Sequence, residues 1–421
     1  MKIEFDRQEM ARRFIRYASI CTQSEEGAAD TPSTDHQREL AALLAGELEE
    51  MGAEDVFYDR EKCYVYASVP AWPASADVPC LALIAHMDTS NAVSADQVHP
   101  RLIPDYDGGV IVLDGEKKIV SDPENFTDLK KQVGKMLVVT DGHSVLGGDD
   151  KAGVAEIMEC AKYFLEHPKV PHAGIRIMFT PDEEVGNGPL NADLDRLGAD
   201  FGYTLDGGDA GQLEYENFNA ASAHVTVEGV STHPGSGKDL MQNALLMLIK
   251  FNDLLPADQI PARTEGYEGF YHLTDMSGDC ESAQAHYIIR DHDRGKFEER
   301  KRLMEEAADR INKHNGRSAV SLEIRDSYYN MEEKIRPHMH IIRTAEKAIR
   351  ETGLEPIIDP IRGGTDGCVF SYRGLPCPNL GTGAYHFHSR YEYVCVEEMV
   401  QAAQIAVRIA AAYAGKGGKR E

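Results

Sequence analysis

The sequence predicts an α/β protein with two parts, the second inserted into the first. The chain has 421 residues, which exceeds the length that a single hydrophobic core usually supports. Two domains are therefore expected. Strand-like and helical stretches alternate in the first half, and after residue 214 the order changes to βαββαβ. We therefore expect a domain built from residues 1–214 and 332–421, and a smaller inserted α/β sandwich at residues 215–331.

The elements of the first part follow from hydrophobic periodicity. Apolar residues at helical spacing predict helices at 36–52, 150–166 and 396–412. A continuous apolar run predicts a buried strand at 78–85, and two further strands are predicted at 175–179 and 201–205. In the inserted part, strands are predicted at 219–230, 270–276, 283–289 and 319–327, and helices at 240–255 and 294–315.

Net charge, hydrophobicity and cysteine pattern argue against several kinds of binding partner and metal site. The net charge of −26 argues against nucleic acid or an anionic membrane as partner, because both bind basic surfaces. The N-terminal residues show no apolar signal-peptide core, and no run approaches the roughly 18 apolar residues that cross a bilayer. A cytoplasmic location is expected. The eight cysteines form no CxxC pair, which predicts reduced packing residues and no thiolate zinc site.

Residues of metal-ligand type occur in five short segments of the chain. The segments are Ala85-His86-Met87-Asp88, Gly148-Asp149-Asp150-Lys151, Pro181-Asp182-Glu183-Glu184, Thr204-Leu205-Asp206-Gly207 and, near the C-terminus, Tyr385-His386-Phe387-His388. Open α/β sheets place their sites at the carboxyl ends of strands, where three of these segments fall. Two histidines combined with several carboxylates suit two divalent ions such as zinc, which predicts a metallohydrolase.

Each segment taken alone also has an ordinary structural explanation. His86 fits a histidine at a strand end, Asp149 a helix N-cap and Asp206 a turn residue. Three adjacent carboxylates at 182–184 fit a solvated acidic loop, and His388 fits a surface histidine. Because ligand-type residues at neighbouring strand ends converge in space, the metal interpretation is favoured over these separate explanations.

Longer motifs around these residues resemble the M20 family of co-catalytic zinc peptidases, and in particular its tripeptide aminopeptidases. The resemblance covers nearly the whole chain. It rests on the segments 84–89, 146–153, 179–186, 204–208, 264–272, 287–291, 360–367 and 374–380. It implies a zinc-peptidase-like catalytic domain with a mixed central sheet flanked by helices. The inserted part would then be a lid and dimerisation domain, and the protein a homodimer.

The resemblance also implies roles for individual residues. One zinc is expected on His86 and Asp206, and the second on Glu184 and His388. Asp149 is expected to bridge the two ions through a cis peptide to Asp150. As catalytic residues, Asp88 would orient His86 and Glu183 would act as general base.

Four further residues are expected to contact a short peptide substrate. The lid residue His233 matches the family histidine that stabilises the oxyanion. Arg362, in a glycine-rich loop, is expected to clamp the free carboxylate of the peptide. Arg290 and Asn243 are weaker candidates for the same task.

The expected reaction is release of the N-terminal residue from tripeptides by attack of a metal-activated water. Another M20-type hydrolase, such as a dipeptidase, aminoacylase or deacetylase, remains the nearest alternative. An inactive metal-binding scaffold is a remote alternative, because a scaffold needs no spare base such as Glu183.

Overall fold

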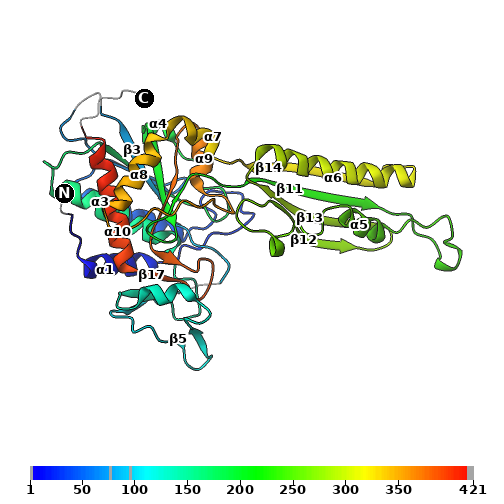
Figure 1. Ribbon diagram of the computed structural model, residues 1–421, viewed down its shortest axis with the longest axis horizontal. Coiled ribbons are helices and arrows are strands. Elements are labelled where there is room, and N and C mark those ends of the chain that lie inside the picture. The colour runs from blue at the N-terminus through cyan, green and yellow to red at the C-terminus, as the bar shows by residue number, and fades with distance from the viewer. Residues whose placement is uncertain (1–2, 75–77, 94–96, 415–421) are drawn as a thin grey trace. The chain divides into compact units, whose positions relative to one another are not determined.

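The computed structural model describes residues 3–74, 78–93 and 97–414, which form two compact units (Figure 1). Unit 1 comprises Met1–Tyr215, Lys334–Ile358 and Thr365–Glu421. Unit 2 comprises Glu216–Glu333 and Asp359–Gly364. The short segment Asp359–Gly364, which carries Arg362, therefore belongs with unit 2, although the expected catalytic range of 332–421 included it.

Unit 1 is built around a seven-stranded mixed sheet, as expected. In spatial order its strands are β1 (Glu54–Asp59), β2 (Tyr64–Val69), β8 (Gly174–Thr180), β3 (Cys80–His86), β9 (Phe201–Gly207), β15 (Asn379–Gly381) and β10 (Leu213–Glu214). The four strands β8, β3, β9 and β15 run parallel, and the remaining pairings are antiparallel. The carboxyl ends of the parallel strands therefore lie along one edge.

Helices cover both faces of this sheet. The helices of unit 1 are α1 (Arg7–Ala18), α2 (Gln37–Met51), α3 (Gly148–Glu166), α4 (Leu194–Leu197), α8 (His340–Arg350), α9 (Asp366–Tyr372) and α10 (Val396–Ala412), with the short α7 (Glu332–Ile335) at the boundary of the units. Helix α3 packs on β3 and β9, and α1 and α10 pack against it (Figure 1). On the opposite face, Leu197 of α4 and Phe370 of α9 share a core cluster with Ile84 and Met178.

A second small sheet in unit 1 was not predicted from the sequence. Its order is β16 (Ala384–Tyr385), β17 (Tyr393–Cys395), β7 (Leu137–Val139) and β4 (Arg101–Ile103), and a separate hairpin pairs β5 (Ile111–Asp114) with β6 (Ile119–Ser121). Its strands have two or three residues, too few to show a period. This sheet pairs the segment around residue 138 with the segment that follows His388.

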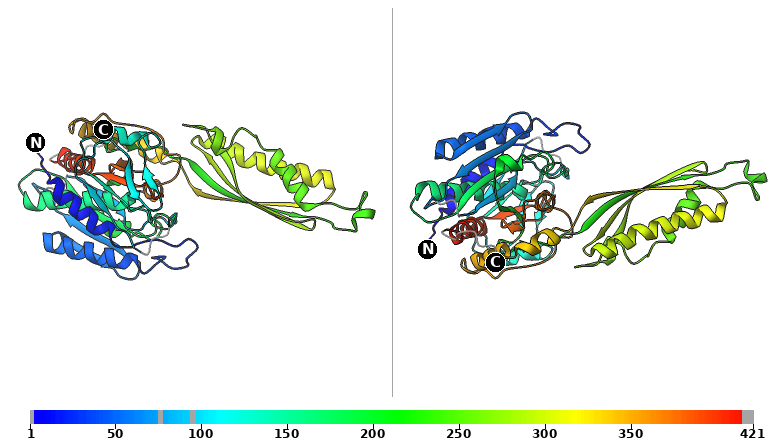
Figure 2. Two further views of the ribbon diagram at one scale, coloured as in Figure 1. Left: turned by 90° about the horizontal axis from the view of Figure 1, so that it is seen from below. Right: turned by 90° about the horizontal axis from the view of Figure 1, so that it is seen from above.

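Unit 2 has the predicted βαββαβ order. Its elements are β11 (Asn219–Glu228), α5 (Ala244–Asp253), β12 (Phe270–Gly278), β13 (Ser282–Asp291), α6 (Arg294–Asn315) and β14 (Val320–Tyr328). The four strands form an antiparallel sheet in the order β12-β13-β11-β14, and both helices lie on one face of it (Figure 2). Helix α5 begins later than expected, because Asn243 caps it by accepting the Leu246 N–H at 3.0 Å.

Two further expectations are met within the described residues. None of the helices found there is long and apolar enough to cross a membrane. All eight cysteines are unpaired, and five of them are buried, as packing residues should be.

Candidate metal centre

The main-chain elements of unit 1 bring the predicted ligand segments to one place. His86 is the last residue of β3, Asp206 lies at the end of β9, and Glu183 and Glu184 follow β8. These three strands are neighbours and run parallel, so their carboxyl ends meet. Asp149 lies in the first turn of α3, which crosses this sheet. The expected convergence of strand ends is confirmed.

Asp149 lies between two histidines. Its Oδ1 is 2.8 Å from Nε2 of His86, and its Oδ2 is 3.1 Å from Nε2 of His388. The peptide bond between Asp149 and Asp150 is cis, as the resemblance implied. Each oxygen of one carboxylate thus faces a different imidazole, which is the arrangement that a ligand shared by two ions requires.

Each histidine also faces a second carboxylate. Nε2 of His86 is 3.5 Å from Oδ1 of Asp206, and Nε2 of His388 is 2.8 Å from Oε2 of Glu184. His388 comes from the loop between β16 and β17, where its φ of 56° marks a left-handed turn. The structure therefore brings together all five residues that the sequence singled out as ligands.

Asp88 connects the ring of His86 to the loop that carries the two glutamates. The main-chain carbonyl of Asp88 accepts a hydrogen bond from His86 Nδ1 at 3.0 Å. Because a carbonyl only accepts, Nδ1 carries the proton and Nε2 is left to face Asp149 and Asp206. The carboxylate of Asp88 accepts the N–H groups of Glu183 at 3.0 Å and Glu184 at 3.2 Å. The sequence predicted that the carboxylate of Asp88 orients His86. That carboxylate lies 3.4 Å from Nδ1, while the main-chain carbonyl accepts the hydrogen bond. The contact of the carboxylate with the glutamate loop was not predicted.

Two buried acids that hold the main chain of the centre were not predicted. Glu392 accepts the N–H groups of Leu146, Gly147 and Asp149, at 2.6 to 3.0 Å. Asp150 accepts the N–H groups of His86 at 3.1 Å and Gly153 at 3.2 Å. Asp150 belongs to the predicted ligand motif, but Asp149 next to it is the predicted ligand. Nothing in the sequence around Glu392 indicates its contact across 243 residues.

Burial and mutual repulsion shift the pKa values of these groups. Burial, followed by the charge of Asp149, raises the pKa of Asp206 to about 7. Burial likewise raises the pKa of Glu183 well above its usual value. Burial opposes ionisation of Asp149 as well, but hydrogen bonds from His388 and His86 bring its pKa below the usual range. The same contacts with Asp149 and Glu184 raise the pKa of His388 to about 11.

The donor set fits a divalent cation. Oε1 of Glu184 is buried and has no hydrogen-bond partner among the described residues, although a buried carboxylate oxygen needs one. Two groups of side chains offer ligand atoms within 4.8 Å of one another: His86 with Asp149 and Glu184, and His86 with Asp150 and Asp206. Cations placed there would replace the protons that these crowded carboxylates otherwise take up. Fold and site together define a carboxylate–imidazole centre, buried around His86 and exposed at His388, of the kind found in metal-dependent hydrolases.

The expected substrate-binding arginines of unit 2 differ in their surroundings. Arg362 donates to the main-chain oxygens of Thr264, Gly266 and Glu268, so its guanidinium organises the 264–268 loop. Arg290 is largely removed from solvent, which lowers its pKa, and it lies over the ring of Tyr328 at 5.2 Å. Among the described residues no carboxylate pairs with Arg290.

The other two expected substrate residues also have local contacts in unit 2. His233 is exposed and precedes a short 3₁₀ helix at Pro234–Ser236, where its Nδ1 accepts the Gly235 N–H at 3.2 Å. Its Nε2 therefore carries the proton in the neutral ring. Asn243 uses its side-chain oxygen to cap α5.

Comparison with known proteins places the chain in a family. The model of peptidase family M20/M25/M40 matches residues 145–412. Peptidase T of Alkaliphilus oremlandii is 47% identical over 407 residues, which is 96% of this chain and 99% of the relative. Peptidase T of Bacillus subtilis is 44% identical over 404 residues, 96% of this chain and 98% of the relative. The chain therefore belongs to the M20 family and, within it, to the peptidase T group.

Solved structures show the same fold. Aminopeptidase PepT from Bacillus cereus has a TM-score of 0.76 at 21% identity, covering 97% of this chain and 99% of that one. A tripeptidase from Staphylococcus aureus has a TM-score of 0.75 at 19% identity, covering 97% and 98%. These likenesses support the expected zinc-peptidase-like fold with its separate smaller domain.

Proposed function

We propose that this protein is a metal-dependent aminopeptidase that releases the N-terminal residue from tripeptides. The observation that carries the proposal is the placement of Asp149 between His86 and His388, with Asp206 and Glu184 on either side. Membership of the peptidase T group supports the tripeptide substrate.

Two divalent ions, zinc in our proposal, would occupy this centre. His86 and Asp206 would hold one ion, Glu184 and His388 the other, and Asp149 both. When bound, such ions polarise the scissile carbonyl and acidify the attacking water. Glu392 accepts the main-chain N–H of Asp149, and the two carboxylate oxygens of Asp150 accept the N–H groups of His86 and Gly153, so we assign neither acid a metal.

Glu183 is proposed as general base. Its main-chain N–H is fixed by Asp88, while its carboxylate makes no hydrogen bond within the described residues. Burial raises its pKa, as a proton-transfer group near neutral pH requires. Glu183 would take a proton from the attacking water and pass it to the leaving amine.

Arg290 is the residue we favour for the free carboxylate of the peptide. A desolvated guanidinium without a carboxylate partner is costly, and an anionic ligand would offset that cost. Arg362 remains a candidate, but its donors already hold loop carbonyls. His233, with its proton on Nε2, would donate to the developing oxyanion. The contact of Asn243 with the substrate stays a prediction.

The decisive experiment compares di-, tri- and tetrapeptides with free or acetylated N-termini, with zinc added or chelated. We expect free tripeptides to be cleaved fastest, after their first residue, and only with metal. Cleavage of N-acetyl amino acids in preference to tripeptides would favour the M20 acylase alternative, and preference for dipeptides the dipeptidase alternative. Zinc binding without turnover of any of these substrates would leave the scaffold alternative.

Assembly and location also remain predictions. The homodimer rests on the resemblance alone, and chromatography with light scattering tests it. The cytoplasmic location is tested by cell fractionation.

A further inference from the structure

A buried carboxylate lies directly before the two glutamates of the centre. Asp182 is fully buried and has a φ of 57°, so the chain turns sharply into Glu183. Its side chain does not face the metal-type ligands. It accepts hydrogen bonds from a distant segment, donated by the Ser33 N–H at 2.8 and 2.9 Å, the Ser33 hydroxyl at 2.6 Å and the Gln37 amide at 2.6 Å.

Gln37 holds Asp182 at two points. Besides donating to the carboxylate, its side-chain oxygen accepts the main-chain N–H of Asp182 at 3.2 Å. Gln37 is the first residue of α2 and is fully buried. A carboxylate and a carboxamide buried together are retained only when their hydrogen bonds are made, and here each satisfies the other.

The same N-terminal segment reaches the loop after β3. The N–H of Ser24 donates to the Thr89 carbonyl at 3.1 Å, and the N–H of Thr89 donates to Thr22 at 3.2 Å. Thr89 follows Asp88, whose carboxylate holds the N–H groups of Glu183 and Glu184. Residues 22–37 therefore make hydrogen bonds to two loops: the one that carries Glu183 and Glu184, and the one that carries Asp88.

We propose that Ser33 and Gln37 are positioning residues, which fix the orientation of Glu183 and Glu184 by holding the carboxylate of Asp182. Neither residue touches a ligand-type side chain of the centre, so they act through Asp182. This inference rests on the proposed function for its kinetic consequences only. Supporting hydrogen bonds of this kind typically change metal affinity or activity by about 10- to 100-fold.

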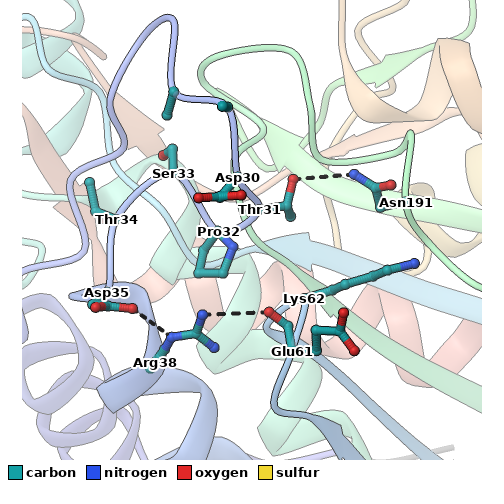
Figure 3. Close-up of a pocket in the computed structure, with 12 residues that line it drawn as sticks. Asp30, Thr31, Pro32, Ser33, Thr34, Asp35, Arg38, Glu61, Lys62 and Asn191 are labelled. Carbon is teal, nitrogen blue, oxygen red and sulfur yellow. Dashed lines mark hydrogen bonds and ion pairs between the residues drawn. The ribbon is translucent and has the colours of Figure 1, made fainter.

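The same segment supplies a matched control. Residues 28–35 line a surface cavity of about 590 Å³ together with Arg38, Lys62 and Asn191 (Figure 3). There Arg38 donates to Asp35 and to the Arg60 carbonyl, and it makes no contact with Asp182. Arg38→Ala thus disturbs the same segment, one residue from Gln37, without touching the proposed path.

The first test compares Ser33→Ala, Gln37→Leu and Arg38→Ala in the full-length, metal-loaded enzyme. We expect the first two to lower kcat by about 10- to 100-fold with KM for a tripeptide within about twofold, since neither residue meets substrate. Arg38→Ala should retain wild-type kcat, and Ser33→Thr should recover activity by restoring the hydroxyl. Unchanged kcat per metal-loaded molecule in both Ser33→Ala and Gln37→Leu would overturn the proposal, whatever their melting temperatures.

Two further measurements separate positioning from general damage. With Co²⁺ in place of zinc, the visible spectrum should shift in Ser33→Ala and Gln37→Leu but not in Arg38→Ala. In an Asp182→Asn background, Gln37→Leu should lower kcat little further, because both changes disrupt the same interaction between Gln37 and Asp182. Independent, additive losses would contradict action through Asp182. If the wild type cleaves no peptide, the proposed function fails, while the Co²⁺ spectra still decide the positioning role.

Discussion

Glu183 and Glu184 are adjacent and identical in type, but the surroundings of their side chains differ. One oxygen of Glu184 is 2.8 Å from His388 and the other is buried without a partner among the described residues. The Glu183 side chain points to no such partner, and its main chain is tied to Asp88. This difference supports the proposed division, with Glu184 as a metal ligand and Glu183 as the general base.

Glu183→Gln tests that division of roles. The amide keeps the size of the side chain but cannot accept a proton, so kcat should fall by about 10²- to 10⁴-fold. Metal content, measured by elemental analysis, should stay that of the wild type. The exposed Glu116→Gln serves as control. Loss of metal together with activity would show that Glu183 is a ligand.

Arg290→Met tests the carboxylate site. Losing a charge-assisted hydrogen bond costs about 1.5–3 kcal/mol, so KM for free tripeptides should rise about 10- to 100-fold. Tripeptide amides lack the carboxylate and should show little change. Arg294→Met, on the exposed start of α6, is the control. An equal rise in KM for acids and amides would contradict the assignment.

At the scale of elements, the centre depends on how closely α3 approaches β9. A Cβ on Gly153 would lie 1.9 Å from the carbonyl oxygen of Leu205, the residue before Asp206. Only glycine lets the helix that carries Asp149 approach the strand that carries Asp206 this closely.

Gly153→Ala should therefore separate these two ligands. We expect destabilisation of about 1–3 kcal/mol from overpacking, together with weaker metal binding. Thermal unfolding and zinc titration measure the two effects. Gly46→Ala in α2 is the matched control, since its Cβ meets nothing within 4 Å. There the better helix propensity of alanine should leave the protein as stable or slightly more so. Unchanged zinc affinity in Gly153→Ala would argue against this coupling.

Glu156 gives α3 a pH-dependent contribution to stability. Both its carboxylate oxygens are buried without a hydrogen bond among the described residues, and burial raises its pKa well above the usual value. A folded-state pKa above the unfolded one means that the folded protein retains the proton longer. The contribution is complete below the unfolded pKa of about 4.3 and is lost as pH rises through the folded value.

Glu156→Gln should remove that dependence. The variant should gain thermal stability relative to the wild type by about 1.4 kcal/mol per pH unit between the unfolded pKa and the raised folded pKa of Glu156, and the gap should level off above the folded pKa. Melting temperatures at matched pH values measure the gap. Glu166→Gln, exposed at the end of the same helix, should show no such trend. A gap that stays constant with pH would contradict the interpretation.

At the scale of the whole molecule, the two units have separate hydrophobic cores and only unit 1 holds the candidate centre. Unit 2 packs its sheet against α5 and α6 in a core cluster of its own. The single tryptophan, Trp72, lies in unit 1, where its main chain pairs with His172. Its fluorescence therefore reports on the unit that would bind metal.

Chelation should lower the midpoint of thermal unfolding followed by Trp72 fluorescence and leave part of the circular-dichroism transition unmoved. Zinc at 100 times its Kd should restore about 2.7 kcal/mol to unit 1. Mg²⁺ at the same concentration is the control, because it suits oxygen ligands rather than imidazole. Equal shifts in both signals would mean that the two units unfold together.

Local patterns in the sequence were enough for the elements and for the candidate ligands. The period of apolar residues located α6 and α10 to the residue, and it gave the order of unit 2. His86, Asp149, Glu184, Asp206 and His388 stood out because each lies in a short motif of ligand-type residues, and the first four lie beside the start or end of an element. The resemblance, rather than spacing, divided the ligands between two ions.

Only the tertiary structure showed what holds those candidate ligands in place. Glu392 reaches the main chain of Asp149, and Gln37 reaches Asp182, across long stretches of sequence. The segment around residue 138 pairs with the one after His388 through strands too short to show a period. A periodic pattern records which face of one element is buried, whereas a hydrogen bond between distant segments leaves no local trace. The sequence by itself thus determined the fold class and the chemistry of the ligands, and three-dimensional packing decided their supports.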